Sequence, residues 1–342
     1  MSRTIHESRR QFFKQLGAGV ATVGGMSFLG RVAQAATGFP ITGVGGRDAI
    51  DRVSATSAAA FLRDTGNGFY TIKAMGIPNH ATGIFPNENC PESILAQNST
   101  FRMTSKPQAV SKPIALEGWL FGVCLNGVVL DPSGPFWRGD AKTGWLFEVN
   151  STTARQYLGL DQNNAHCQAG GEYHYHGLPV GLLNRILDDR QARGAQNGMI
   201  LLGFAADGFP IYAPIGHSNA IDSTSSLKTL RSSYVLKSGA RPSTGPQGNH
   251  DGSFCMDYEY RAGSGDLDEC NGRFGVTAEY PKGTYYYVLT YDYPFIPRFW
   301  KGKPDKSFAH GPGLAGGGAI PEVPAPMQTS APVPKELLKL FP

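Results

Sequence analysis

The segment GGEYHYHGLP, residues 170–179, places two histidines and two tyrosines alternately in a short aromatic run bounded by glycines. Aromatic residues in such a run favour a β-strand. Alternate residues of a strand point to the same face, so His174 and His176 are expected on one face and Tyr173 and Tyr175 on the other. The segment therefore predicts a strand with two imidazoles side by side.

A third histidine, His166, lies eight residues before His174, and Gly170-Gly171 between them allows the chain to turn back. Imidazole is a ligand that suits zinc, copper, iron and nickel. Together with His176, these histidines are candidate ligands of a transition metal. The alternative interpretation is an aromatic core strand whose histidines are hydrogen-bonded and inert.

Two segments of the chain have similar sequences and align with each other without gaps. Residues 122–131, GVCLNGVVLD, align with residues 203–212, GFAADGFPIY. Each contains an Asn-Gly or Asp-Gly pair between two apolar runs, which is a strong signal for a β-hairpin.

An aromatic strand follows each hairpin and extends the echo. In this overlay His174 matches Tyr286 and His176 matches Val288. We interpret the chain as two related halves packed together, of which only the first keeps the imidazoles.

Short aromatic and β-branched runs alternate with turn residues through most of the chain, and one segment, residues 178–193, has a helical apolar face. The expected strands lie at residues 68–73, 114–123, 144–149, 199–205, 234–237 and 283–291. This spacing predicts a mainly β fold of sandwich type with few helices. The expected organisation is one domain over residues 36–310, with related halves at about 75–195 and 196–305.

The N-terminus carries SRRQFFK at residues 8–14, which matches the twin-arginine export pattern. The apolar segment that follows is too short and too rich in glycine to cross a membrane, which takes about 20 apolar residues. Ala33-Gln34-Ala35 then supplies a cleavage site. We expect residues 1–35 to be a signal peptide cleaved after Ala35, the twin-arginine translocase to be an export partner, and the mature protein to be periplasmic or secreted without a stable membrane span.

Removal of this peptide changes the charge balance. It takes away five of the 31 Lys and Arg residues and one of the 27 Asp and Glu residues, which leaves 26 of each. The mature chain is therefore formally neutral and shows no basic cluster, so nucleic acid and anionic lipid are not expected partners.

Two further features concern the rest of the mature chain. Residues 311–342 are rich in Pro, Gly and Ala with little charge, and they are expected to form a flexible tail.

The five cysteines lie at 90, 124, 167, 255 and 270, and their odd number leaves at least one thiol unpaired within the chain. Cys255 and Cys270, close in sequence, are the preferred disulfide.

Residues 75–305 resemble the YHYH-domain proteins, a family named for the tetrapeptide at 173–176. The resemblance rests on long strings, among them MGIPNHATGIFPN, LNGVVLDP, NNAH, GFAADGFPIYAP, GDLDECNGRFGVTAEYPKGTYYYVLT and YPFIPRFWKG. It adds His80, which matches the family pattern, as a fourth candidate ligand. Many members repeat Y-H-Y-H in the second half, where this chain has 285–288, YYYV, so the resemblance concentrates attention on the first half. It implies no settled activity.

A histidine-rich pocket accepts zinc or copper: three imidazoles and a water are typical of catalytic zinc, and a closed set suits copper binding. Three acidic residues are candidates for an oxygen ligand, a general base or a group that orients an imidazole: Asp207, Asp268 and Glu269. The alternative for Asp207 is a side chain that caps its own hairpin. The acidic run at 266–269 could instead hold calcium, although a solvated turn is the favoured interpretation.

Two hypotheses follow. The first is an exported protein that binds copper or zinc through His166, His174 and His176, with His80 as a fourth ligand; whether it is an enzyme stays open. The second is a metal-free structural or ligand-binding β module of the cell envelope, in which the histidines only make hydrogen bonds.

Overall fold

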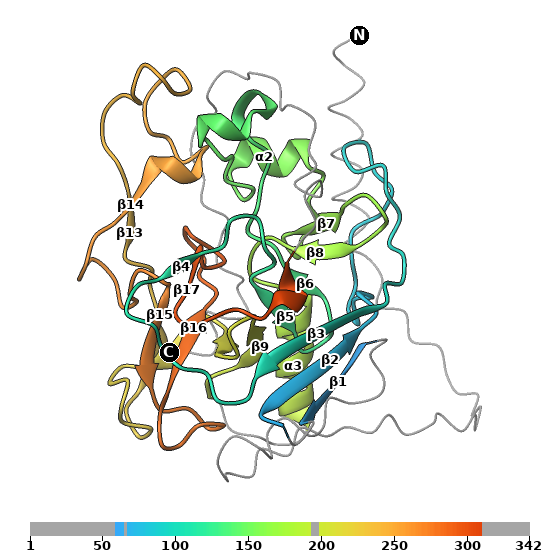
Figure 1. The fold of residues 1–342 in the computed structure, drawn as a ribbon, viewed down its shortest axis with the longest axis vertical. Coiled ribbons are helices and arrows are strands. Elements are labelled where there is room, and N and C mark those ends of the chain that lie inside the picture. Colours follow the sequence, from blue (N-terminus) through green and yellow to red (C-terminus); the bar gives the residue numbers. More distant parts are fainter. Residues whose placement is uncertain (1–58, 65–66, 193–197, 310–342) are drawn as a thin grey trace, which may run out of the picture. The chain divides into compact units, whose positions relative to one another are not determined.

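The computed structural model describes residues 59–64, 67–192 and 198–309 (Figure 1). The predicted signal peptide and C-terminal tail lie outside these residues. Within the described part, no helix is both long and apolar enough to cross a membrane.

One large sheet dominates the described residues. Its strands are β5 (Gly122–Cys124), β6 (Val129–Leu130), β7 (Ala165–Cys167), β8 (Tyr173–Tyr175), β9 (Leu201–Ala205), β10 (Pro210–Tyr212), β15 (Gly272–Gly275) and β16 (Thr284–Val288). Smaller sheets pair β1 (Ala59–Asp64), β2 (Phe69–Ala74) and β3 (Ser99–Thr104), β11 (Ile215–His217) with β12 (Leu227–Thr229), β13 (Tyr234–Leu236) with β14 (Tyr258–Tyr260), and β17 (Phe299–Trp300) with β4 (Ile114–Ala115). The fold is mainly β, as predicted.

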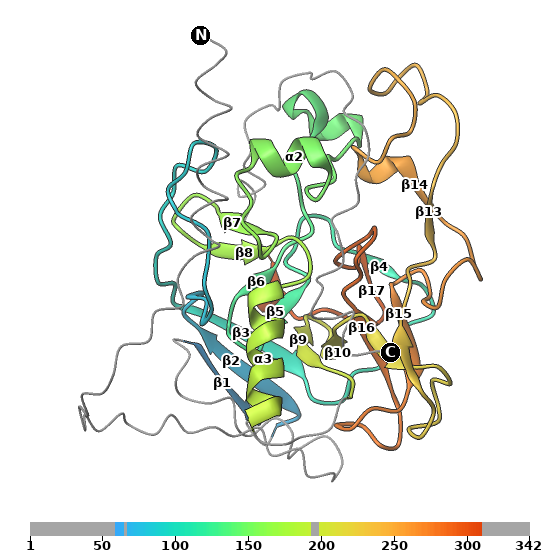
Figure 2. The same cartoon turned by 180° about the vertical axis from the view of Figure 1, so that it is seen from behind.

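Helices contribute little. The α-helices are α2 (Thr152–Tyr157) and α3 (Val180–Ala192), and short 3-10 turns span Trp137–Gly139, Ala141–Thr143, Cys255–Asp257 and Lys306–Phe308. The predicted helix at 178–193 is confirmed as α3, which buries Leu182, Leu183 and Ile186. In the view of Figure 2 this helix runs in front of the strands.

The strand order of the large sheet is symmetric about its middle. The order is β15-β16-β10-β9-β5-β6-β8-β7, so each half contains a hairpin, a strand parallel to it and an antiparallel outer strand. At the centre, β5 and β9 pair antiparallel, with Val123 opposite Phe204. The strand arrangement is therefore the same on both sides of the centre of the sheet.

The residue register repeats between the halves. Leu130 pairs with Tyr175 in parallel, and Ile211 pairs with Tyr287 in the same way. On the outer strands, the pair His166 and His174 corresponds to the pair Arg273 and Tyr286.

The two central hairpins follow from their turn residues. In each, the side-chain oxygen of the residue before the turn glycine accepts a backbone N–H two residues later: Asn126 from Val128 and Asp207 from Phe209, both at 3.3 Å. Such a side chain stabilises the turn that the sequence predicts. Asp207 thus caps its own hairpin, in addition to the contacts described below.

The core lies around this sheet. All residues of β5, β9 and β10 are buried, and the large buried side chains include Phe121, Tyr173, Tyr175, Tyr286, Tyr287 and Trp300. A second, smaller cluster packs Trp137, Trp145, Phe147, Ala154 and Phe254. Removal of so much aromatic surface from water is the main stabilising term of this fold.

Two predicted strands differ from the structure. Residues 114–123 split into β4 and β5 because Glu117, at φ 48°, turns the chain and the Trp119 N–H bonds to the Leu116 carbonyl. Residues 144–149 form only isolated bridges, such as Phe147 with Phe254, because this segment packs its aromatic rings into the smaller cluster rather than joining a sheet.

Candidate metal centre

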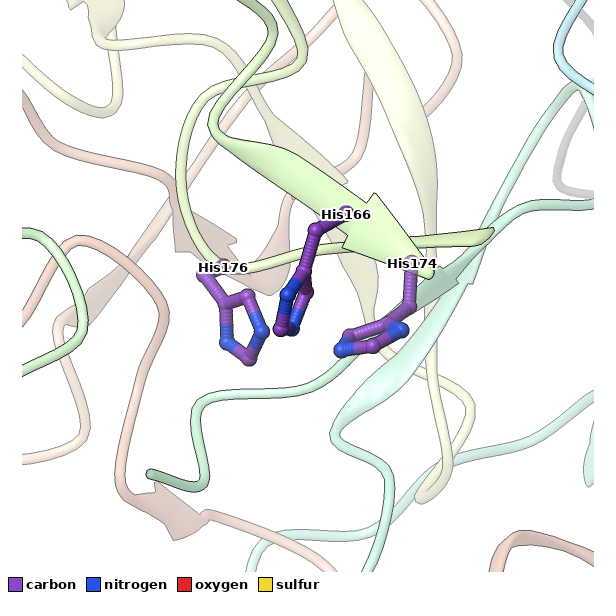
Figure 3. Close-up of side chains that lie close together, drawn as sticks. All are labelled: His166, His174 and His176. Atoms are coloured by element: carbon purple, nitrogen blue, oxygen red, sulfur yellow. The ribbon is translucent and has the colours of Figure 1, made fainter. Parts of the chain in front are cut away.

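Two neighbouring strands and the residue after them position three imidazoles together (Figure 3). His166 on β7 lies directly across the antiparallel ladder from His174 on β8. His176 comes directly after β8, two residues beyond His174, and its backbone N–H bonds to the Asn164 carbonyl at 2.7 Å, which keeps it beside β7. The side chains of His174 and His176 share one face, as the alternation predicts.

The three rings are close enough to share one ion. Their ring centroids are 4.6 to 5.0 Å apart, and one ligand nitrogen from each lies within 4.8 Å of the others. Zn–N bonds are about 2 Å long, so nitrogens on one ion are at most about 4 Å apart. To bind one ion, the three rings would have to rotate until their nitrogens reach that separation.

Backbone carbonyls orient two of the rings. The Nδ1 atom of His166 lies 2.7 Å from the Leu158 carbonyl oxygen, and the Nδ1 atom of His174 lies 3.0 Å from the Glu172 carbonyl oxygen. A carbonyl only accepts, so each Nδ1 carries the proton and the lone pair is on Nε2. Metal-binding histidines commonly donate their other N–H in this way.

The ring of His176 is buried, and the burial of its polar nitrogens is not offset by well-formed hydrogen bonds with other described residues. It is 3 % exposed, and neither of its ring nitrogens has a hydrogen-bond partner among the described residues. Burial moves its pKa well below 6.5, His174, His166 and Arg298 lower it further, and the backbone of Asp131 opposes the shift. The ring is therefore neutral, with polar atoms that are buried at a cost of about 1–3 kcal/mol.

A buried ion pair lies near His176. The guanidinium of Arg298 donates to Glu148 Oε2 at 2.6 Å and to the Pro132 carbonyl. Burial raises the pKa of Glu148, and the charge of Arg298 opposes this rise. The guanidinium Nε atom is buried and has no hydrogen-bond partner among the described residues.

The tyrosine face of β8 holds a separate network, and His80 belongs to it. The Nε2 atom of His80 lies 2.5 Å from the Tyr175 hydroxyl, which also accepts from Asn126 Nδ2 at 2.9 Å. Tyr173 donates to Asp161 Oδ2 at 2.7 Å. The structure thus places His80, our candidate fourth ligand, behind β8 rather than with the triad, because it stacks on the tyrosines.

The acidic candidates lie in the other half of the sheet. Asp207 accepts from the Tyr287 hydroxyl at 2.5 Å and from the Gly302 N–H at 2.8 Å, and burial raises its pKa to about 6. Asp268 accepts from the Tyr285 hydroxyl at 2.8 Å, and Glu269 accepts the Tyr234 hydroxyl through its backbone carbonyl at 2.7 Å.

None of these acids joins the triad. Among the described residues, the group of His, Cys, Asp and Glu side chains that meets metal-site geometry consists of His166, His174 and His176. The carboxylate of Asp266, in the run considered for calcium, instead pairs with Lys228 Nζ at 2.5 Å.

The residues that surround the triad were not predicted from the sequence. The Leu158 carbonyl is a backbone acceptor that no motif marks. Arg298 lies in the string YPFIPRFWKG, and a charged residue inside such an apolar, aromatic string was a signal for a buried role.

The comparison with known families gives one match. The model of the family described as "YHYH protein" matches residues 100–302, more than half of the chain. No curated protein and no solved structure matches. The chain belongs to the YHYH protein family.

Proposed function

We propose that this protein is exported and binds one transition-metal ion, copper or zinc, through His166, His174 and His176. The observation that carries the proposal is the environment of His176. A buried imidazole whose ring nitrogens make no well-formed hydrogen bond is costly, and a metal ion held with the other two imidazoles would satisfy one of these nitrogens.

The donor set fits these metals. Three imidazoles held together by one hairpin favour zinc or copper over calcium and magnesium, which prefer oxygen ligands. The carbonyls of Leu158 and Glu172 hold the protons of two rings away from the ion. The rigid β7–β8 ladder supports the ligands from behind, which is the usual requirement for a defined metal geometry.

Export is the second part of the proposal, and it rests on the sequence. SRRQFFK at residues 8–14 and Ala33-Gln34-Ala35 support transport by the twin-arginine translocase and residence in the periplasm or outside the cell. The N-terminal residue of the exported protein tests this part: we expect Ala36, and export should stop when Arg9 and Arg10 are both changed to lysine.

Elemental analysis tests the metal site. The full chain, purified without a metal-affinity tag and reconstituted with Cu²⁺ or Zn²⁺ separately, should retain about one equivalent after gel filtration. H174A/H176A should retain none while its far-UV circular dichroism is unchanged.

The matched control is H80A, which removes a histidine that packs against the opposite, tyrosine face of β8 and should keep the full equivalent. Full occupancy in H174A/H176A, or no metal in the folded wild-type chain with either ion, would overturn the proposal.

A further inference from the structure

The outer edge of β7 is covered by a segment from far upstream, residues 83–97. Near its start, the Gly83 N–H donates to Asp161 Oδ2 at 2.9 Å. Near its end, the Leu95 N–H donates to the Gly171 carbonyl, also at 2.9 Å. The segment is therefore fixed on both sides of its middle, close to the β7–β8 hairpin.

Cys90 lies between these two attachments and faces β7. Its thiol donates to the Cys167 carbonyl at 3.3 Å, and the Cys167 side chain and the His166 ring lie near its sulfur. The residues are 2 % and 3 % exposed. Two buried cysteines held this close inside a fixed frame need little backbone movement to bond.

We propose that Cys90 and Cys167 form a disulfide that fastens residues 83–97 to β7, next to His166. Both S–H bonds break and one S–S bond forms. The two protons go to solvent, and the two electrons reduce a disulfide donor by thiol–disulfide exchange.

The other cysteines do not compete for this pair. The Cys255 thiol lies against the Phe147 carbonyl and Glu148, and Cys270 is buried in the second half of the sheet, so the pairing that we favoured from sequence is not formed. All five cysteines are thiols in the structure. The preferred pair is therefore Cys90 and Cys167, which are 77 residues apart in sequence but close in space, rather than Cys255 and Cys270, which are close in sequence.

The disulfide would close a long loop. Such a bond restricts the unfolded chain more than a short-range one does, and it would also hold the strand that carries His166. The inference does not depend on metal binding, because its test reads only the cysteines.

Peptide mapping tests the bond directly. The full chain is incubated with oxidised glutathione in urea below its unfolding transition, so that local opening admits the reagent, and a second sample is refolded in the same buffer. After alkylation and non-reducing digestion, we expect a linked peptide pair that contains Cys90 and Cys167 and disappears on reduction. Five alkylated thiols in both samples, a glutathione adduct on Cys90 alone, or another pairing would overturn the proposal.

Thermal unfolding supplies a second readout. The oxidised wild-type chain should melt higher than the reduced chain, by roughly 5–10 °C. C90S and C167S should each lose this difference, and C124S, the matched change of another buried cysteine, should keep it. A difference that persists in C90S would assign the bond to other residues.

Discussion

The two halves of the large sheet place different chemistry at corresponding positions. In the first half, His166 and His174 face each other across the outer strands; in the second, Arg273 donates from Nε to the Tyr286 hydroxyl at 2.6 Å. Val288 stands where His176 would be. The second half thus carries its own cation on a side chain, whereas the first half presents three imidazoles around a position that suits a cation. The same strand pairing therefore holds the hydrogen-bonded Arg273 and Tyr286 side chains in one half and the candidate metal site in the other.

The tyrosines behind these residues differ in a related way. Asn126 donates to the Tyr175 hydroxyl, whereas Asp207, at the corresponding hairpin position, accepts from the Tyr287 hydroxyl. An amide and a carboxylate at one position therefore reverse the direction of the hydrogen bond. What the two halves share is the backbone pairing, and what separates them is a small number of side chains.

The largest effect should come from giving the first half the residues of the second. The variant H166R/H174Y/H176V should lose all metal uptake, because no imidazole remains in the triad, and should stay folded, because β15 and β16 accommodate the same residues. Elemental analysis with circular dichroism checks both points. A folded variant that still holds one equivalent would mean that the metal binds elsewhere.

The reverse exchange should create a second site. R273H/Y286H/V288H places three imidazoles on the matching ladder, and we expect metal uptake to rise from one equivalent to about two. R273H/Y286H, which keeps Val288, is the matched control and should bind the second ion more weakly. If the folded triple variant remains at one equivalent, the correspondence of side-chain positions between the halves fails.

The tyrosine pair offers a comparison of stability. Y287F removes the donor to the carboxyl of Asp207, which is 1 % exposed, and should lower the free energy of unfolding by about 2 kcal/mol. Y175F should cost about 1 kcal/mol, because Asn126 Nδ2 keeps its contact with Asn79 Oδ1 at 3.3 Å. Urea unfolding at pH 7 measures both. Equal losses of unfolding free energy in the two variants would show that the direction of the hydrogen bond has no effect on stability.

The last effect concerns the dependence of stability on pH. The pKa of His176 is about 6.5 in the unfolded chain and well below this value in the folded chain, so acidification protonates the unfolded chain first. The contribution of His176 to stability is therefore present above pH 6.5 and lost as pH falls from 6.5 towards the folded-state pKa, with a limiting slope of about 1.4 kcal/mol per pH unit.

H176V should remove this dependence, since valine is the residue at the corresponding position of the second half. Unfolding of the metal-free chain in chelator, measured at several pH values from 7.5 to 5, gives the two slopes. Identical slopes in H176V and the wild-type chain would contradict the assignment of this pH dependence to His176.

The triad was accessible from sequence because its geometry is local. Alternation on one strand put His174 and His176 on the same face, and Gly170-Gly171 allowed the chain to return so that His166 meets them. The hairpin is closed by a Gly171 N–H to Gln168 carbonyl bond of 2.9 Å, with both glycines at positive φ. Side-chain period and turn chemistry were therefore enough to group the three histidines.

The position of His80 depended on long-range packing and could not be read in this way. It meets Tyr175, 95 residues later, through ring stacking and a hydrogen bond rather than through any spacing rule. The thiol pair had the same difficulty, since proximity in sequence favoured Cys255 and Cys270. Local patterns located the candidate site, and tertiary contacts decided which residues surround it.

The close pairing of β5 with β9 bears on how each half would associate if it were produced alone. A Cβ atom on Gly122 would lie 2.4 Å from the Phe204 carbonyl oxygen, and one on Gly203 would lie 2.3 Å from the Val123 carbonyl oxygen, so each half needs a glycine where it meets the other. Such reciprocal contacts are those of an isologous dimer, joined here in one polypeptide. Either half produced alone would expose an unpaired inner strand, which is an open template for association with a second copy. Within one chain, the pairing of β5 with β9 occupies both of these inner strand edges.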